Sequence, residues 1–117
     1  MNRFKKEKEA EKMNVLLACG GGMSSSILAE NLVLEAEKNG VADFYIEATG
    51  TEEVGLKMQQ KAWDVLLLAP QVSFRKAHLQ KEADQYGIPL LPIEGILYTP
   101  MGIPELYQLI MQNEKNN

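Results

Sequence analysis

The residues with the clearest potential for chemistry form one short stretch, in which the only cysteine, Cys19, precedes three glycines and a run of serines. A cysteine thiolate is a nucleophile, and glycines let backbone N–H groups approach an anion with no Cβ atom in the way. Hydroxyls at Ser24, Ser25 and Ser26 add hydrogen-bond donors. The stretch predicts a cysteine that attacks a phosphorus atom, inside a loop that holds the phosphoryl oxygens.

Two elements must position this loop. The short continuous apolar run from Val15 to Ala18 is typical of a strand that is covered on both faces. From Ser26 onward apolar residues recur at helical spacing, so a helix follows, and the free N–H groups of its first turn favour both the thiolate and a bound anion. The predicted phosphate-binding loop comprises Gly20, Gly21, Gly22, Met23, Ser24, Ser25 and Ser26.

A cysteine that only packs in the core is the alternative interpretation, since free cysteine is among the most buried residue types. The position of Cys19, directly after a strand and before a glycine-rich helix start, favours the chemical role over that alternative.

The rest of the chain predicts the sheet that carries the loop. Further strands are expected at 41–48, 65–69 and 89–93, with helices between them and a last helix from 103. Strand 41–48 alternates in polarity and therefore belongs at an edge. Right-handed crossovers then give an α/β fold: a four-stranded parallel sheet in the order 2-1-3-4 with helices on both faces, as in low-molecular-weight tyrosine phosphatases.

This strand order places the cysteine where the sheet changes direction. Ligands of such sheets bind outside the carboxyl ends of the strands at that switch point. Pro70 and Gln71 end the third strand, so we expect them to meet Cys19 there, with Tyr98 as a further flanking residue. Whether Gln71, Tyr98 or Arg75 contacts the phosphate or a partner is left open.

Other features of the chain are interpreted as structural. Thr49 and Glu52 have capping-box spacing at a helix start, and Glu47, Glu52 and Glu53 are interpreted as solvated carboxylates rather than an acid/base pair. His78, the sole histidine, lies on a polar stretch and is interpreted as a solvated surface residue. The helix after Gln71 has as its expected apolar members Val72, Phe74, Ala77, Leu79 and Ala83.

Length and composition limit the classes of protein. A chain of 117 residues, 45% hydrophobic and 24% charged, forms one ordinary globular domain, which we assign to residues 13–113. Residues 1–12 are expected to be a mobile charged tail and residues 114–117 a frayed end. A net charge of -4 without a basic stripe argues against nucleic acid. A single cysteine excludes a disulfide framework and fits a reducing compartment, so a cytoplasmic location is expected, without insertion into the membrane.

Three cysteine chemistries compete for the site. A low-molecular-weight tyrosine phosphatase requires an arginine six residues after the cysteine, where this chain has Ser25, and no Asp is evident as a general acid. Thiol redox chemistry lacks its usual resolving cysteine. Reversible phosphoryl transfer, in which the cysteine accepts a phosphoryl group and passes it on, requires neither and fits best.

The stretch Cys19-Gly-Gly-Gly-Met23-Ser24-Ser25-Ser26 resembles the phosphorylation loop of the IIB components of the bacterial sugar phosphotransferase system, in the lactose/cellobiose/chitobiose family. The similarity extends to Glu47-Ala48, to the run that ends at Pro70-Gln71 and to Leu97-Tyr98, and covers about residues 14 to 112. Relatives often carry Ser or Ala where this chain has Gly20.

The resemblance implies a concrete activity. A IIA protein would pass a phosphoryl group from its histidine to Cys19, and the phosphocysteine would deliver it to a sugar held by the membrane component IIC. The fold that it implies agrees with the strand order 2-1-3-4. No cofactor and no metal are expected. The sugar is left open among β-linked disaccharides such as cellobiose, chitobiose and lactose.

Overall fold

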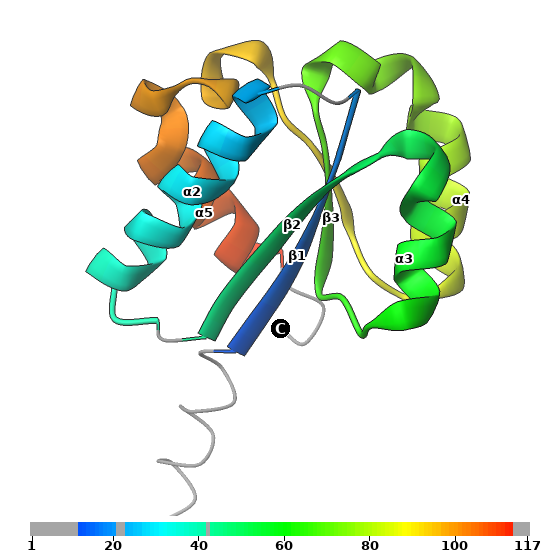
Figure 1. Ribbon diagram of the computed structural model, residues 1–117, viewed down its shortest axis with the longest axis horizontal. Helices are drawn as coiled ribbons and strands as arrows, with labels where there is room; N and C mark the ends of the chain where they lie inside the picture. The colour runs from blue at the N-terminus through cyan, green and yellow to red at the C-terminus, as the bar shows by residue number, and fades with distance from the viewer. Residues whose placement is uncertain (1–11, 21–22, 42, 114–117) are drawn as a thin grey trace, which may run out of the picture.

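The structure is a computed structural model that describes residues 12–20, 23–41 and 43–113, and of Met23, Ser24 and Ser25 it describes the backbone. Its centre is a four-stranded parallel sheet in the order β2-β1-β3-β4. The strands are β1 (Lys12–Cys19), β2 (Asp43–Gly50), β3 (Val65–Leu68) and β4 (Leu90–Pro92). The predicted fold class and strand order are confirmed (Figure 1).

Helices cover both faces of the sheet. On one face α2 (Met23–Lys38) packs beside α5 (Ile103–Gln112), and on the other α3 (Val54–Gln60) lies beside α4 (Lys76–Gln85), as Figure 1 shows. Short 3-10 helices connect these elements, namely η1 (Thr51–Glu53), η2 (Pro70–Arg75), η3 (Gly95–Tyr98) and η4 (Pro100–Gly102).

The two central strands form the core. Residues Val15 to Ala18 of β1 and all of β3 are essentially inaccessible to solvent, as their continuous apolar runs predict. Burying each of their leucines stabilises the fold by about 1.5–3 kcal/mol. β2 is an edge strand, as predicted, and its residues range from exposed to buried.

β2 begins two residues later than expected because Val41 belongs to the end of α2. The Gly40 N–H donates to the Glu37 carbonyl at 3.1 Å, and the Val41 N–H donates to the Ala36 carbonyl at 2.9 Å. This is the pattern of a Schellman motif, and Gly40 adopts the left-handed φ of 80° that the motif requires.

The prediction of a helix directly after Gln71 is wrong for the first turns of that helix. Residues Pro70–Arg75 form η2, in which Val72 has non-helical angles, and the α-helix begins only at Lys76. Helical spacing therefore does not continue through this segment, so Phe74 is 79% exposed and Ala77 is exposed as well. The other expected apolar members, Val72, Leu79 and Ala83, are buried.

The capping box predicted at Thr49 and Glu52 is also wrong. Gly50 precedes η1, and no side chain caps that helix. Thr49 lies inside β2 instead, where it is buried, and its hydroxyl donates to the Glu53 side chain.

Residues 1–11 and 114–117, assigned to the tail and to the frayed end, lie outside the described residues. Lys12, which was assigned to the tail, is the first residue of β1.

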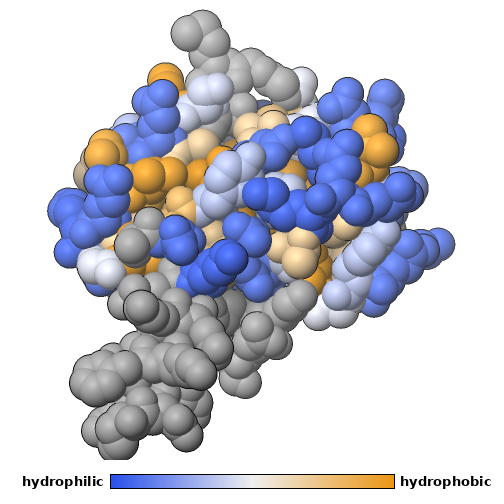
Figure 2. Space-filling model, turned by 60° about the horizontal axis from the view of Figure 1, so that its bottom comes forward, coloured by the Kyte–Doolittle hydropathy of each residue, from blue (hydrophilic) through white to orange (hydrophobic). Residues whose placement is uncertain are grey.

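An apolar surface lies on the α2 side of the molecule. Figure 2, in which the amino ends of the strands are turned toward the viewer, shows hydrophobic residues gathered at the left among hydrophilic ones. A groove of about 410 Å³ there is lined by residues of α2 and β2 that include Val33, Leu34 and Ile46. This groove lies along the outer edge of the sheet.

Candidate active site

Cys19 is the last residue of β1 and lies between the ends of β2 and β3. The connection from β1 leads to β2 on one side, and the connection from β2 leads to β3 on the other side of β1, so the end of β1 lies at the predicted switch point of the sheet. Its side chain is 4% exposed, and its Sγ donates a hydrogen bond to the Thr49 carbonyl at 3.5 Å. The thiol is thus held at the carboxyl edge of the sheet, in contact with the neighbouring strand.

The predicted loop leads from Cys19 directly into α2. Gly20 is exposed, Gly21 and Gly22 lie outside the described residues, and α2 begins at Met23. The helix therefore starts three residues earlier than its apolar spacing indicates, and Ser26 is exposed in its first turns. The side chains of Met23, Ser24 and Ser25 are outside the described part. A helix N-terminus this close to the thiol supplies free backbone N–H groups and a positive partial charge.

The end of β3 contacts the same edge. The Ala69 N–H donates to the Ala18 carbonyl at 2.9 Å, and Pro70 and Gln71 begin η2 immediately afterwards. The methyl Cγ1 of Val72 would lie 3.4 Å from a Cβ at Gly20. The structure thus brings Pro70 and the exposed Gln71 to the edge where Cys19 lies, while their roles stay predictions.

Tyr98 lies on the α2 side of this edge. It is half-buried in η3 and lines a cavity of about 200 Å³ together with Ile27 and Leu28 of α2 and with Thr99. The tyrosine therefore packs next to the first turns of the helix that follows the loop. A contact between Tyr98 and phosphate stays a prediction.

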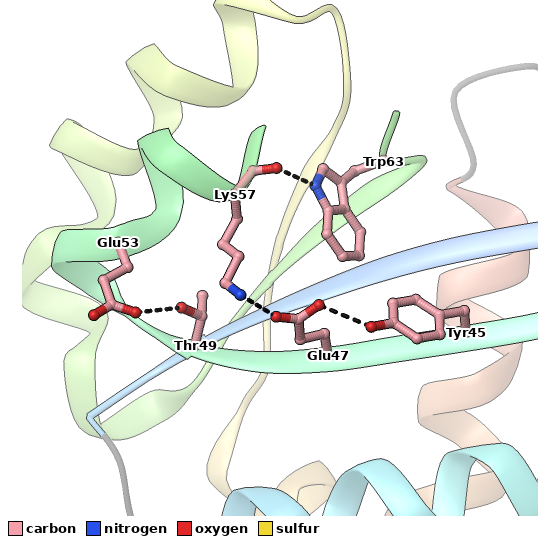
Figure 3. Close-up of polar contacts among 6 residues, drawn as sticks. All are labelled: Tyr45, Glu47, Thr49, Glu53, Lys57 and Trp63. Carbon is pink, nitrogen blue, oxygen red and sulfur yellow. Dashed lines mark hydrogen bonds and ion pairs between the residues drawn. The ribbon is translucent and has the colours of Figure 1, made fainter. Parts of the chain in front are cut away.

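One polar cluster was missed by the sequence interpretation. Glu47, taken there as a solvated carboxylate, forms an ion pair with Lys57 of α3 and accepts a hydrogen bond of 2.9 Å from the Tyr45 hydroxyl (Figure 3). The hydrogen bond from Lys57 lowers the pKa of the Glu47 carboxyl below its usual value. The hydrogen bonds to Glu47 raise the pKa of both Lys57 and Tyr45. The cluster joins β2 to α3 beside the site.

A signal for this cluster was present in the sequence. Tyr45 and Glu47 are two residues apart on one strand, which places them on the same face of the sheet. Their pairing with Lys57 depends on how α3 packs over β2, which local spacing does not specify.

His78 lies in the first turn of α4. It is exposed there, and its Nε2 is 3.6 Å from Glu82 Oε2, in agreement with a surface role. In the part of the chain that the structure describes, no three His, Cys, Asp or Glu side chains gather in a way that suits a metal ion. None of the described helices is long and apolar enough to span a membrane.

The fold and the site together define a small α/β domain with a cysteine at the switch point of a parallel sheet. The comparisons with known proteins agree with that class. A family model described as "PTS system, Lactose/Cellobiose specific IIB subunit" matches residues 14–107. PTS denotes the phosphoenolpyruvate:carbohydrate phosphotransferase system.

Individual relatives support the same assignment. The oligo-beta-mannoside-specific EIIB component of Bacillus subtilis is 39% identical over 84 residues, 72% of this chain and 79% of that protein. The lactose-specific EIICB component of Streptococcus mutans is 32% identical over 88 residues, 75% of this chain and 15% of that protein. The cellobiose-specific IIB component of Borrelia burgdorferi has a similar solution structure, with a TM-score of 0.70, 33% identity and coverage of 90% of this chain and 94% of that one.

The chain belongs to the lactose/cellobiose-specific IIB family of the PTS. It is a phosphotransferase component of sugar uptake.

Proposed function

We propose that Cys19 is the phosphoryl acceptor of this component, and that it takes the group from a phosphohistidine on IIA and passes it to a sugar bound by IIC. The observation that carries the proposal is the position of Cys19 at the switch point, where β1 ends and α2 begins three residues beyond Gly20. An anion at this place meets the N-terminal N–H groups of α2. We assign this activity to a domain of residues 13–113.

The proposed transfer is balanced without a cofactor. The S–P bond forms as the N–P bond of the donor phosphohistidine breaks, and the N–P electron pair stays on the imidazole nitrogen. The thiol proton is given up, and the donor histidine recovers one. In the second step a sugar hydroxyl gives up its proton and attacks the phosphorus atom, the O–P bond of the ester forms and the S–P bond breaks. The sulfur leaves as a thiolate, which recovers a proton before the next cycle. The predicted loop, Gly20 to Ser26, would hold the phosphoryl oxygens between the steps.

Apolar side chains at the carboxyl edge support docking of partner proteins there. Phe74 of η2 is 79% exposed, Ile96 of η3 is 76% exposed, and Met101 of η4 is 92% exposed. These turns follow β3 and β4, so they lie at the same end of the sheet as Cys19 (Figure 1). Exposed apolar side chains of this size are available for contact with another protein.

The sugar and the location form the finer part of the proposal. The relatives carry names with oligo-beta-mannoside, lactose and cellobiose specificity. We infer a β-linked disaccharide or a short β-linked oligosaccharide as the final acceptor. The EIICB relative joins its IIB-like part to further chain, and its name supports IIC as a partner of this family. A cytoplasmic site of transfer belongs to the same proposal.

The test is covalent labelling of the full chain. Incubation with phosphoenolpyruvate, the general transfer proteins and a IIA protein is expected to add the mass of one phosphoryl group. Cys19→Ala is expected to abolish the gain, because the acceptor atom is removed. His78→Gln, which removes the one histidine, is the matched control and is expected to label fully.

Three results would contradict the carrier role. They are no gain in mass on the unmodified chain, a gain that survives Cys19→Ala, and continuous release of inorganic phosphate from the labelled chain without a sugar acceptor. The last of these would indicate a phosphatase.

A further inference from the structure

Thr49 lies beside Cys19 at the carboxyl edge of the sheet. The two strands are paired so that Ala18 faces Thr49 and Cys19 faces Gly50. Thr49 is 6% exposed, and among the described residues it is the one polar residue that is buried. Its carbonyl oxygen accepts the Cys19 thiol at 3.5 Å, so this residue directly contacts the proposed nucleophile.

The side chain of Thr49 is held in turn by Glu53. The Thr49 hydroxyl donates to Glu53 Oε1 at 3.4 Å (Figure 3). Thr49 lies near the end of β2, and Glu53 ends η1 just before α3 begins. The contact therefore closes the turn that leads out of β2 and fixes the peptide group whose oxygen accepts the thiol.

A second attachment on the same strand limits the movement of this turn. Glu47, two residues before Thr49, is paired with Lys57, which lies one helical turn beyond Glu53. Figure 3 shows both contacts, one from β2 to the end of η1 and one from β2 to α3. The end of β2 around Thr49 is thus attached by one link to η1 and by one to α3.

The thiol contact exists only while the sulfur carries a proton. A neutral thiol can donate that proton to a carbonyl, whereas a thiolate and a phosphorylated sulfur have none to donate. When the S–P bond forms, the thiol proton leaves and the Thr49 carbonyl loses this donor. The contact at 3.5 Å therefore belongs to the unloaded carrier.

We propose that Thr49 is a positioning residue for Cys19: its carbonyl orients the thiol in the unloaded protein, and its hydroxyl, held by Glu53, keeps that carbonyl in place. This inference rests on the proposed role of Cys19 as the phosphoryl acceptor. Loading the sulfur releases the Thr49 carbonyl, so the end of β2 and the start of α3 are coupled to the state of the carrier.

The test uses two readouts on Thr49→Val, which keeps the size of the side chain but removes the hydroxyl. The first is the S–H stretching band in the infrared spectrum, which comes from Cys19 alone because the chain has one cysteine. The second is the single-turnover rate of transfer from phosphorylated IIA. We expect the band to broaden and move toward that of a free thiol, and the rate to fall about two- to tenfold, the effect of one modest hydrogen bond.

Matched variants separate positioning from stability. Thr49→Ser keeps the hydroxyl and is expected to retain both the band and the rate. Glu53→Ala, at an exposed residue, is expected to change both in the same direction as Thr49→Val and covers the case in which Thr49→Val fails to fold. Glu52→Ala, at the exposed neighbour, is expected to change neither.

The proposal is overturned if Thr49→Val and Glu53→Ala leave the band and the rate unchanged, or if Glu52→Ala alters them equally. The infrared band does not depend on phosphoryl transfer. An unmodified chain that gains no phosphoryl mass would refute the proposed function, while the band would still test the contact.

Discussion

The two ends of β1 are held in different ways. At the amino end the backbone N–H of Asn14 donates to Asp64 Oδ2 at 2.7 Å, and the Asp64 N–H donates to the Asn14 carbonyl at 2.8 Å. The side-chain amide of Asn14 donates to the Ala62 carbonyl at 2.9 Å. At the carboxyl end the side-chain contacts are longer, 3.5 Å from Cys19 to Thr49 and 3.4 Å from Thr49 to Glu53.

The contacts at the amino end of β1 therefore serve stability, and those at its carboxyl end lie where the proposed chemistry takes place. Short hydrogen bonds, one of them to a carboxylate, fix the amino end in a single arrangement. At the carboxyl end the backbone is held by the Ala69 N–H, which donates to the Ala18 carbonyl at 2.9 Å. The longer side-chain contacts there involve a weak thiol donor that the proposed reaction removes. Strong contacts at the amino end of β1, together with side-chain contacts that can change at its carboxyl end, suit a domain whose proposed nucleophile must gain and lose a group in each cycle.

The largest effect is expected from removing a hydrogen bond at the amino end of β1. Asp64→Ala removes the carboxylate that accepts the Asn14 N–H, and should lower the free energy of unfolding by about 1.5–3 kcal/mol. Urea unfolding followed by circular dichroism measures this change. Because Asp64 lies at the end of the sheet away from Cys19, the transfer rate of the folded protein should stay at the wild-type level.

Asp64→Asn, which keeps one side-chain oxygen as an acceptor, is the matched control and should lose less stability. The comparison of the two ends fails if Asp64→Ala slows transfer in the folded protein, or if it costs no stability.

A smaller effect is expected from the link between β2 and α3. Because the folded-state pKa of Glu47 lies below its usual value of 4.5, the pair with Lys57 contributes stability above that value. The contribution is lost as the pH falls through the lowered pKa of the folded state. The difference in unfolding free energy between wild type and Glu47→Gln should therefore be full at neutral pH and disappear in acid.

Both partners of this pair are partly exposed, so the difference should be smaller than that for Asp64→Ala. Urea midpoints measured for both proteins across the acid range test it. A difference that stays constant down to the lowest pH would show that Glu47 does not act through its charge.

The smallest effect is expected at Gly20. Its φ is outside the left-handed region, and an added Cβ would meet Val72 Cγ1 at 3.4 Å, an ordinary contact. Gly20→Ala should therefore change the free energy of unfolding by less than about 1 kcal/mol. Thermal unfolding measures this change. A larger loss of stability would show that the carboxyl end of β1 is packed as firmly as its amino end.

The sequence predicted the sheet better than the contacts around the site. The continuous apolar runs of β1 and β3 identified the central strands, and the alternation of β2 identified an edge, because burial on one or two faces is recorded directly in residue type. The switch point followed from the strand order. These features depend on patterns within single elements and on the handedness of their connections.

The contacts that depend on how elements pack were missed. The pairing of Glu47 with Lys57 and the contact of Cys19 with Thr49 join separate elements, so local spacing does not reveal them. The exposure of Phe74 was missed for a local reason. Pro70 opens a 3-10 helix and Val72 leaves helical angles, so the 3.6-residue period does not apply there.

The single tryptophan is a fluorescent probe near the amino end of β1. Trp63 is 3% exposed, its ring is tilted by 32° from that of Tyr45 with ring centroids 6.0 Å apart, and it donates its indole N–H to the Lys57 carbonyl at 2.8 Å. An indole in such a dry setting emits at shorter wavelength than one in water. Its fluorescence will follow the melting of the α3 and β3 region, and it leaves the events at Cys19 to be recorded by other probes.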